Sequence, residues 1–221
     1  LAGQPDGLEL QVAAADGAGL IRCWDRDGMI RWEHSLPGTD RLTLSANGAV
    51  TAAWAHRRPL HRTVSLLAAD GTPLGAVTSD REVLDVAVSE KGTYLVVATA
   101  DGVHFCGIGP RGLTRRRFAV MGDPRQVEMA PGDSFYLVCA NPWSVSRVKS
   151  SGRELWRDEE PGAGDYHIHA TPNGDRLAMA GAGPGDVVQL KLVDADGRRL
   201  HGEVRPGRAP QVRVSQDGRA V

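Results

Sequence analysis

The feature that most constrains this chain is an internal repeat. An opening motif of two apolar residues at alternate positions, followed by a small residue and a tight turn, recurs along the sequence. Its copies are Leu42–Ser45, Val86–Ser89, Val127–Ala130, Ile168–Thr171 and Val212–Ser215, with a degenerate copy at Leu1–Gln4. A second series consists of the turn glycines Gly28, Gly71, Gly112, Gly152 and Gly197. Both series advance by about 40–45 residues, the length of one supersecondary unit in repeat proteins.

Within each unit the apolar residues indicate short strands. In the third unit we expect strands at 86–88, 94–99, 103–108 and 116–120, bounded by Gly, Asp and Pro. No segment has helical periodicity over three turns. Units of this length with four strands predict an all-β fold, a β-propeller of four-stranded antiparallel blades. We expect one propeller domain over 1–221, with repeats at approximately 1–41, 42–85, 86–126, 127–167 and 168–211 and a partial repeat at 212–221.

The number of blades is a separate question. Five complete repeats fit the chain, and Val212–Ser215 opens a sixth. We expect roughly one to three further blades of ~40–45 residues, from the same protein or a partner, since an uncovered blade face would leave apolar surface in water. The alternative is a closed five-bladed ring.

Two sequence motifs resemble known propeller families. The segment Ile21–Asp25 ends in the Trp-Asp pair of WD repeats, and Asp27–Trp32 and Ser151–Trp156 are similar to the glycine-to-tryptophan turn of pyrroloquinoline-quinone-like repeats. The resemblance implies the propeller fold. It specifies no activity, although the second likeness raises the prospect of a cofactor.

Composition narrows the function classes. The 26 basic and 27 acidic residues give a net charge of −1, so the chain has no overall field that would attract nucleic acid or an anionic membrane. No apolar run reaches the ~20 residues of a membrane span. Three cysteines without metal-type spacing favour a reducing, cytoplasmic compartment weakly, while Leu1 in place of Met leaves room for a removed leader, so localisation stays unknown.

Unequal spacing between the two series indicates a candidate binding face. The extra residues of units two and five fall between the second and third strands, at 55–62 and 181–186. In an up-down meander these loops share a face with the connections between blades, so we expect a partner to bind the loops 55–62, 140–145 and 181–187 and the connections 37–41, 121–126 and 158–167. The candidate partner-binding residues are Arg57, Arg58, His61, Arg62 and Trp143. A solvated hairpin tip is the alternative for the basic loop.

A second group of candidates lies on the first strands, at the mouth of the central channel. His167 and His169 are two residues apart, so they share a face and could begin a metal site, with Glu128 in the neighbouring unit as a possible carboxylate. Hydrogen-bonded packing is the alternative, and we assign no metal. The channel-mouth ligand candidates are Arg41, Asp85, Gln126, His167 and His169.

Other reactive or aromatic residues are expected to be structural. Cys23, Cys106 and Cys139 lie in apolar strands and are interpreted as buried packing residues. Packing between blades is expected for the tryptophans Trp24, Trp32, Trp54 and Trp156. Arg115–Arg117 lie on an outer strand, where charge prevents pairing between sheet edges.

These observations favour a non-catalytic interaction or scaffold module that binds a protein partner through one loop face. No hydrolase, zinc or dinucleotide motif occurs, and we assign no catalytic residue and no cofactor. The alternative is a propeller with its site at the channel mouth, either a cofactor- or metal-binding enzyme or a small-ligand sensor. Propeller enzymes assemble their sites from several loops, so the enzyme question stays open.

Overall fold

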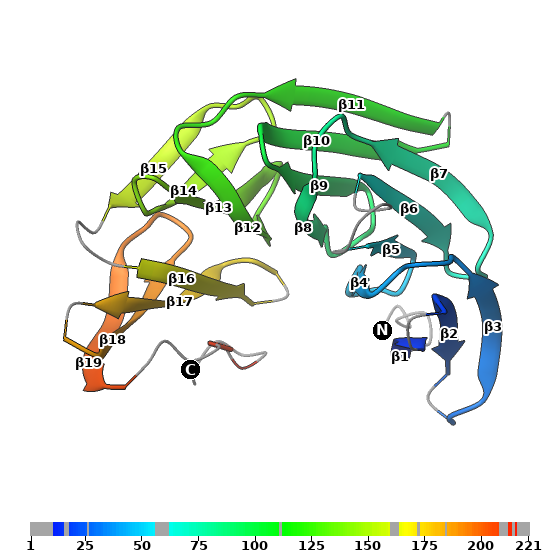
Figure 1. The fold of residues 1–221 in the computed structure, drawn as a ribbon, viewed down its shortest axis with the longest axis horizontal. Coiled ribbons are helices and arrows are strands. Elements are labelled where there is room, and N and C mark those ends of the chain that lie inside the picture. Colours follow the sequence, from blue (N-terminus) through cyan, green and yellow to red (C-terminus); the bar gives the residue numbers. More distant parts are fainter. Residues whose placement is uncertain are drawn as a thin grey trace, which may run out of the picture. The chain divides into compact units, whose positions relative to one another are not determined.

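The computed structural model describes residues 11–15, 18–25, 27–55, 62–110, 112–159, 164–171, 173–183, 185–207, 212, 213 and 215. Its regular elements are all strands, and each sheet is a meander of consecutive strands (Figure 1). The first sheet contains β1 (Gln11–Ala15), β2 (Leu20–Trp24) and β3 (Ile30–Ser35). The second contains β4 (Arg41–Leu44), β5 (Val50–Trp54), β6 (Thr63–Ala68) and β7 (Pro73–Thr78).

The remaining three sheets have four strands each. The third contains β8 (Val83–Val88), β9 (Tyr94–Thr99), β10 (Gly102–Gly109) and β11 (Gly112–Phe118). The fourth contains β12 (Asp123–Ala130), β13 (Ser134–Ala140), β14 (Ser144–Lys149) and β15 (Glu154–Glu159). The fifth contains β16 (Gly164–Ala170), β17 (Arg176–Gly183), β18 (Val187–Asp194) and β19 (Arg199–Pro206). The all-β prediction and the four-stranded meander are confirmed for these sheets.

The chain divides into two compact units. Unit 1 comprises Leu1–Leu95 and Cys106–Arg115, and unit 2 comprises Val96–Phe105 and Arg116–Val221. The division passes through the strands β9, β10 and β11 of the third sheet. The predicted strand Leu1–Gln4 lies outside the described residues.

Strand limits differ from the expectation in three ways. First strands begin earlier than predicted, at Val83, Asp123 and Gly164, because the residues before the apolar pair also belong to the strand. The fourth strand of the third sheet occupies Gly112–Phe118, in place of the predicted 116–120. In the fifth sheet the expected loop 181–186 is shortened, because Gly181–Gly183 belong to β17.

Burial decreases from the second strand of each sheet to the fourth. Every residue of β5 and of β13 is buried, so both faces of these strands are covered by protein. The fourth strands β7 and β11 are exposed along most of their length. A strand that is apolar on both faces must be covered on both sides, so neighbouring sheets stack face to face.

The turns between third and fourth strands share one geometry. In each, the glycine of the second repeat series has a positive φ, between 76° at Gly28 and 99° at Gly112. At Gly71 the glycine N–H donates to the Ala68 carbonyl, and the Ala68 N–H donates to the carbonyl of Thr72. Only glycine adopts this left-handed conformation without steric cost, which explains why the glycine recurs.

Hairpins between first and second strands are closed by a side-chain hydroxyl. The Oγ atoms of Ser45 and Ser89 accept hydrogen bonds from the N–H groups of Val50 and Tyr94, and Thr171 Oγ1 accepts one from Arg176. These hydroxyls occupy the last position of the first repeat series, so the small polar residue recurs because it completes the turn.

Tryptophans join adjacent sheets at the third-to-fourth turns. The Trp32 indole donates to the Ala69 carbonyl at 2.9 Å, and its ring covers Gly71 so closely that a Cβ built there would lie 2.8 Å from it. Trp156 repeats the arrangement: it donates to Ala195 at 2.8 Å and covers Gly197. In both cases a tryptophan on the last strand of one sheet packs on the turn glycine of the next sheet. This agrees with the packing between blades predicted for Trp32 and Trp156.

Other side chains fill this position where the tryptophan is missing. Phe118 covers Gly152, and its ring also stacks on Phe135 with centroids 5.9 Å apart. At Gly75, which stands where β3 has Trp32, the space is taken by Leu113 from the following sheet. The sheets therefore keep the same docking position although the residue that fills it changes.

Two glycine substitutions in unit 1 test this docking. Gly28 and Gly71 have φ values of 76° and 82°, but a Cβ at Gly28 meets nothing within 4 Å whereas a Cβ at Gly71 meets the Trp32 ring. Gly28→Ala should lose only the backbone term, about 1–2 kcal/mol. Gly71→Ala should lower the free energy of unfolding by a further ~1–3 kcal/mol, because the ring must move. Urea denaturation measures both, and equal losses would show that the ring contributes nothing.

Candidate functional site

One pocket in unit 2 collects several of the predicted residues. It has a volume of about 240 Å³ and is lined by Gln126, Glu128, His167, Ile168, His169, Val212 and Arg213. The lining comes from the first strands β12 and β16 and from the segment that follows β19. Three of the five predicted channel-mouth candidates therefore lie together.

The pocket follows the repeat. Glu128, His169 and Arg213 occupy the same position in three successive copies of the opening motif, between its two alternating residues. Arg213 was absent from the sequence-based candidates. The signal that identifies it is this shared repeat position.

The two histidines face away from the fourth sheet. In the ladder with β17, His167 pairs with Ala180 and His169 with Ala178. These alanines form a buried cluster with Leu192 and Val212. The intervening Ile168 packs in the other direction, against the fourth-sheet residues Tyr136 and Val138 among others. The alternation of the strand thus places both imidazoles on the surface where Val212 is seated.

Gln126 links two first strands. Its Nε2 donates to the Ile168 carbonyl at 2.7 Å, and its Oε1 accepts from the Ile168 N–H at 3.0 Å. The amide satisfies both backbone groups that Ile168 presents at the free edge of the fifth sheet. Gln126 therefore has a structural role, which the sequence analysis did not assign.

His169 lies in an environment that disfavours its charged form. Burial lowers the pKa of its imidazole below the usual 6.5, and the nearby Arg213 guanidinium lowers it further. His169 is half-buried and His167 is exposed. Both effects oppose the charged form of His169.

The other two channel-mouth candidates belong to unit 1. Arg41 is the first residue of β4, is exposed, and pairs in register with Trp54. Asp85 is half-buried in the middle of β8.

The candidates on the loops are only partly described. Arg57, Arg58 and His61 lie outside the described residues. Arg62 is exposed directly before β6, and its carbonyl accepts a hydrogen bond from the Ser79 N–H. Trp143, expected as an exposed aromatic anchor, is half-buried and packs on Tyr166 with ring centroids 6.3 Å apart.

The cysteines are buried, as expected. Burial raises the pKa of the Cys106 thiol to about 11 and that of Cys139 to about 12, and it also raises the pKa of Cys23. Thiols in this environment remain protonated at neutral pH and are poor nucleophiles.

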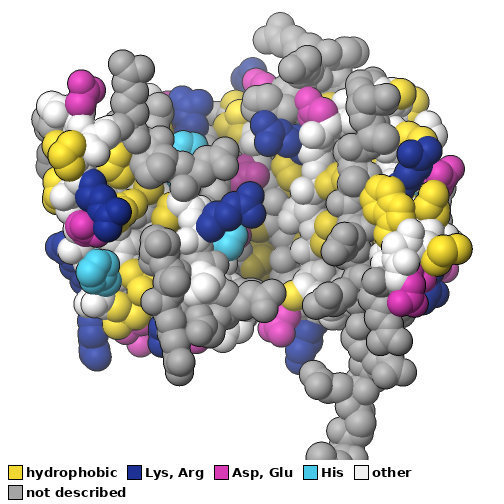
Figure 2. All heavy atoms as spheres, turned by 90° about the horizontal axis from the view of Figure 1, so that it is seen from below, with side chains coloured by type: hydrophobic (Ala, Val, Ile, Leu, Met, Phe, Trp, Pro, Cys, Tyr) yellow, Lys and Arg dark blue, Asp and Glu magenta, His cyan; other side chains and the backbone are white. Residues whose placement is uncertain are grey.

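Groups for metal or membrane binding are not assembled in the described part of the chain. No three His, Cys, Asp or Glu side chains among those residues are placed to share a metal ion. No helix in that part is long and apolar enough to cross a membrane. Figure 2 shows acidic and basic side chains interspersed over one face, consistent with the net charge of −1.

Comparisons with known proteins identify the fold. No protein-family model matches the chain, and no curated protein matches it. Among solved structures, it is similar to the β-propeller domain of Cps50 (Swd1) from Myceliophthora thermophila, a WD40 propeller, with a TM-score of 0.68 and 12% sequence identity. The match covers 88% of this chain and 68% of that one. The fold is therefore a β-propeller, as predicted, and the match does not specifically support the likeness to pyrroloquinoline-quinone-like repeats.

The amide bridge can be tested by substitution. Gln126→Ala should lower the free energy of unfolding by about 1–2 kcal/mol, because the N–H and carbonyl of Ile168 lose their partner at a half-buried edge. Arg125→Ala, at an exposed neighbour on the same strand, is the control and should stay within about 0.5 kcal/mol. Equal effects of the two changes in urea denaturation would contradict the bridge.

The lowered pKa of His169 predicts a pH dependence of stability. In the unfolded chain the imidazole regains a pKa near 6.5, so the unfolded state takes up the proton more readily. The contribution of neutral His169 is complete above pH 6.5 and is lost as pH falls through the lower, folded pKa. The unfolding free energy of the wild type should therefore fall more steeply from pH 8 to pH 5 than that of His169→Gln. His201→Gln, at an exposed residue of β19, should follow the wild type.

Proposed function

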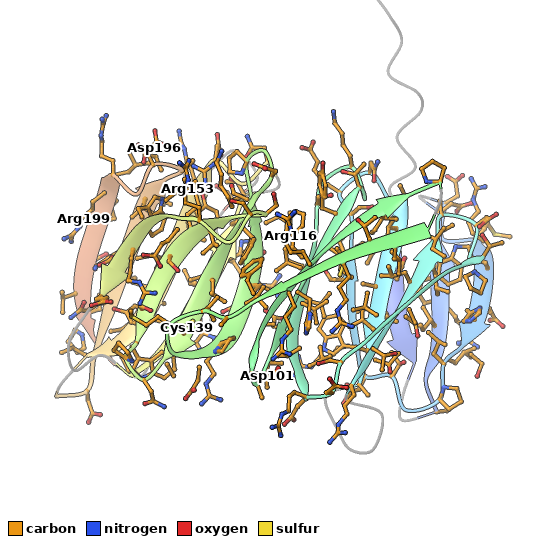
Figure 3. The ribbon with its side chains drawn as sticks, turned by 90° about the horizontal axis from the view of Figure 1, so that it is seen from above. Asp101, Arg116, Cys139, Arg153, Asp196 and Arg199 are labelled. Atoms are coloured by element: carbon orange, nitrogen blue, oxygen red, sulfur yellow. The ribbon has the colours of Figure 1, made fainter. Side chains whose placement is uncertain are left out.

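We propose that this chain is a non-catalytic β-propeller interaction module that binds a protein partner through one side of its sheets. The loop side is formed by the connections between second and third strands and from each fourth strand to the next sheet. The turn side is formed by the hairpins between first and second and between third and fourth strands. In unit 2, the turn-side residues Arg153 and Asp196 lie at one end of the strands, and the loop-side residue Asp101 lies at the other end (Figure 3).

The observation that carries the proposal is the different use of polar groups on the two sides. On the turn side, side chains are committed to their own backbone: Asp25, Asp70 and Asp194 each accept hydrogen bonds from backbone N–H groups of their own turns. The Ser45, Ser89 and Thr171 hydroxyls close other turns on this side in the same way.

The loop side is varied by contrast. The connections between second and third strands range from residues 100–101 in the third sheet to residues 55–62 in the second. Variable loops on a rigid sheet scaffold are the usual location of recognition residues. The exposed Arg62 and the half-buried Trp143 both lie in these connections, and aromatic and arginine side chains often dominate binding energy.

The chemistry of the described residues supports binding over catalysis. The three thiols are buried with raised pKa values, and the described part of the chain assembles no metal-ligating triplet. The likeness to the Swd1 propeller concerns the fold and carries no partner over to this chain.

A small-ligand function is the second candidate. The specific observation in its favour is the polar pocket in unit 2, which brings Glu128, His169 and Arg213 together. A sensor of this kind would use the same scaffold without a protein partner.

Charge reversals on the two sides test the protein-binding proposal. Arg62→Glu and the pair Arg57→Glu with Arg58→Glu alter the loop side, whereas Arg153→Glu alters the turn side. A protein captured from native lysate, purified and titrated against each variant, should bind the loop-side variants at least tenfold more weakly and the turn-side variant like wild type. Loss of affinity with Arg153→Glu alone would show that the partner binds the turn side and would contradict the proposal.

A further inference from the structure

We infer that the pocket in unit 2 binds a carboxylate-bearing ligand, held between the Arg213 guanidinium and the imidazoles of His167 and His169. This deepens the second candidate function by naming the ligand class of the pocket. The loop-side proposal is tested separately, by the charge reversals at Arg57, Arg58 and Arg62, so the failure of one proposal can be told from the failure of the other.

Three side chains of the pocket offer hydrogen-bond donors. Gln126 directs both ends of its amide to Ile168. In the remaining polar lining Arg213 only donates, His167 and His169 each have at least one ring N–H to donate, and the Glu128 carboxylate only accepts. A guanidinium offers two parallel N–H groups to a carboxylate, and a charge-assisted pair of this kind is stronger than a neutral hydrogen bond.

The size of the pocket limits the ligand to a small molecule or a single side chain. A volume of about 240 Å³ is the space of about eight water molecules at ~30 Å³ each. Val212 is nearly fully buried and supplies apolar lining next to the donors. A short alkyl chain that ends in a carboxylate matches this combination.

The charge of the lining favours a carboxylate over a phosphate. Arg213 contributes one positive charge and Glu128 one negative charge. A dianion would meet Glu128 with twice the repulsion of a monoanion, while the single guanidinium offers the same compensation. At pH 8, where inorganic phosphate is mainly the dianion, it should therefore bind more weakly than a monocarboxylate.

Binding should be coupled to protonation. The ionisable groups that face His169 are Glu128 from β12, His167 from its own strand and Arg213, whereas β17 opposes the two histidines with Ala178 and Ala180. Burial and Arg213 lower the pKa of His169 and so favour its neutral form before binding. A ligand carboxylate beside the imidazole favours its charged form, so binding takes up a proton and strengthens as pH falls.

The test is an NMR titration of the full chain with isotopically labelled histidine. Propionate, succinate, N-acetylglutamate amide and inorganic phosphate are added separately at pH 6 and pH 8. We expect the carboxylates to shift the His167 and His169 signals, to raise the pKa of His169, and to bind several-fold more tightly at pH 6. Tighter binding of the capped glutamate than of propionate, both of them monoanions, would identify a protein side chain as the source, and the reverse would identify a free small molecule.

Variants define the site. Arg213→Gln should weaken binding of the preferred carboxylate by roughly 10–100-fold, the range for a hydrogen bond to a charged group. Arg153→Gln removes the same charge from a turn outside the pocket and should leave binding unchanged. The inference is overturned if no carboxylate shifts the histidine signals at millimolar concentration, if phosphate binds as tightly as the carboxylates, or if the two arginine variants behave alike.

Discussion

The structure depends on one constraint: second strands such as β5, β9 and β13 are apolar on both faces and need a neighbour on each side. Strands such as β5 and β13 are buried along their whole length. A single four-stranded sheet can bury only one face by itself, so the stacking of sheets is a condition of stability. The apolar pattern recurs along the sequence because successive sheets must meet this same requirement.

Such a stack has a second requirement: polar backbone groups at the sheet edges and turns need hydrogen-bond partners. Side chains of this chain supply them. Gln126 covers the free N–H and carbonyl of Ile168, and Arg147 donates from its guanidinium to the Pro131 and Ala195 carbonyls and to Ser134 Oγ. Lys191 joins Asp158 of the preceding sheet at 2.9 Å. These polar links lie where adjacent sheets meet, and they fix the register of one sheet on the next, a task that apolar contact alone performs poorly.

Much of the fold was predictable because its determinants are local. The glycine at the third-to-fourth turns and the hydroxyl of Ser45, Ser89 and Thr171 at first-to-second turns act within a few residues, so their spacing reveals the repeat. Contacts between sheets were harder to predict. Phe118 replaces a tryptophan from a position two residues further along its strand, and Arg213 joins the pocket only because a segment beyond the fifth sheet lies against β16. For the candidate site, sequence located the histidines, while the bridging use of Gln126 required coordinates.

The meander order of the sheets has a consequence for how the chain folds. Every strand pairs with the strand next to it in sequence, so each hairpin closes a short loop and loses little chain entropy. Hairpins of this kind form in microseconds, well before distant segments meet. The slow step is then the docking of preformed sheets, at which Trp32 and Trp156 seat on their glycines. A propeller with this topology can start to fold at any of its sheets, and a chain emerging from the ribosome can stack each sheet on its predecessor as soon as the fourth strand is complete.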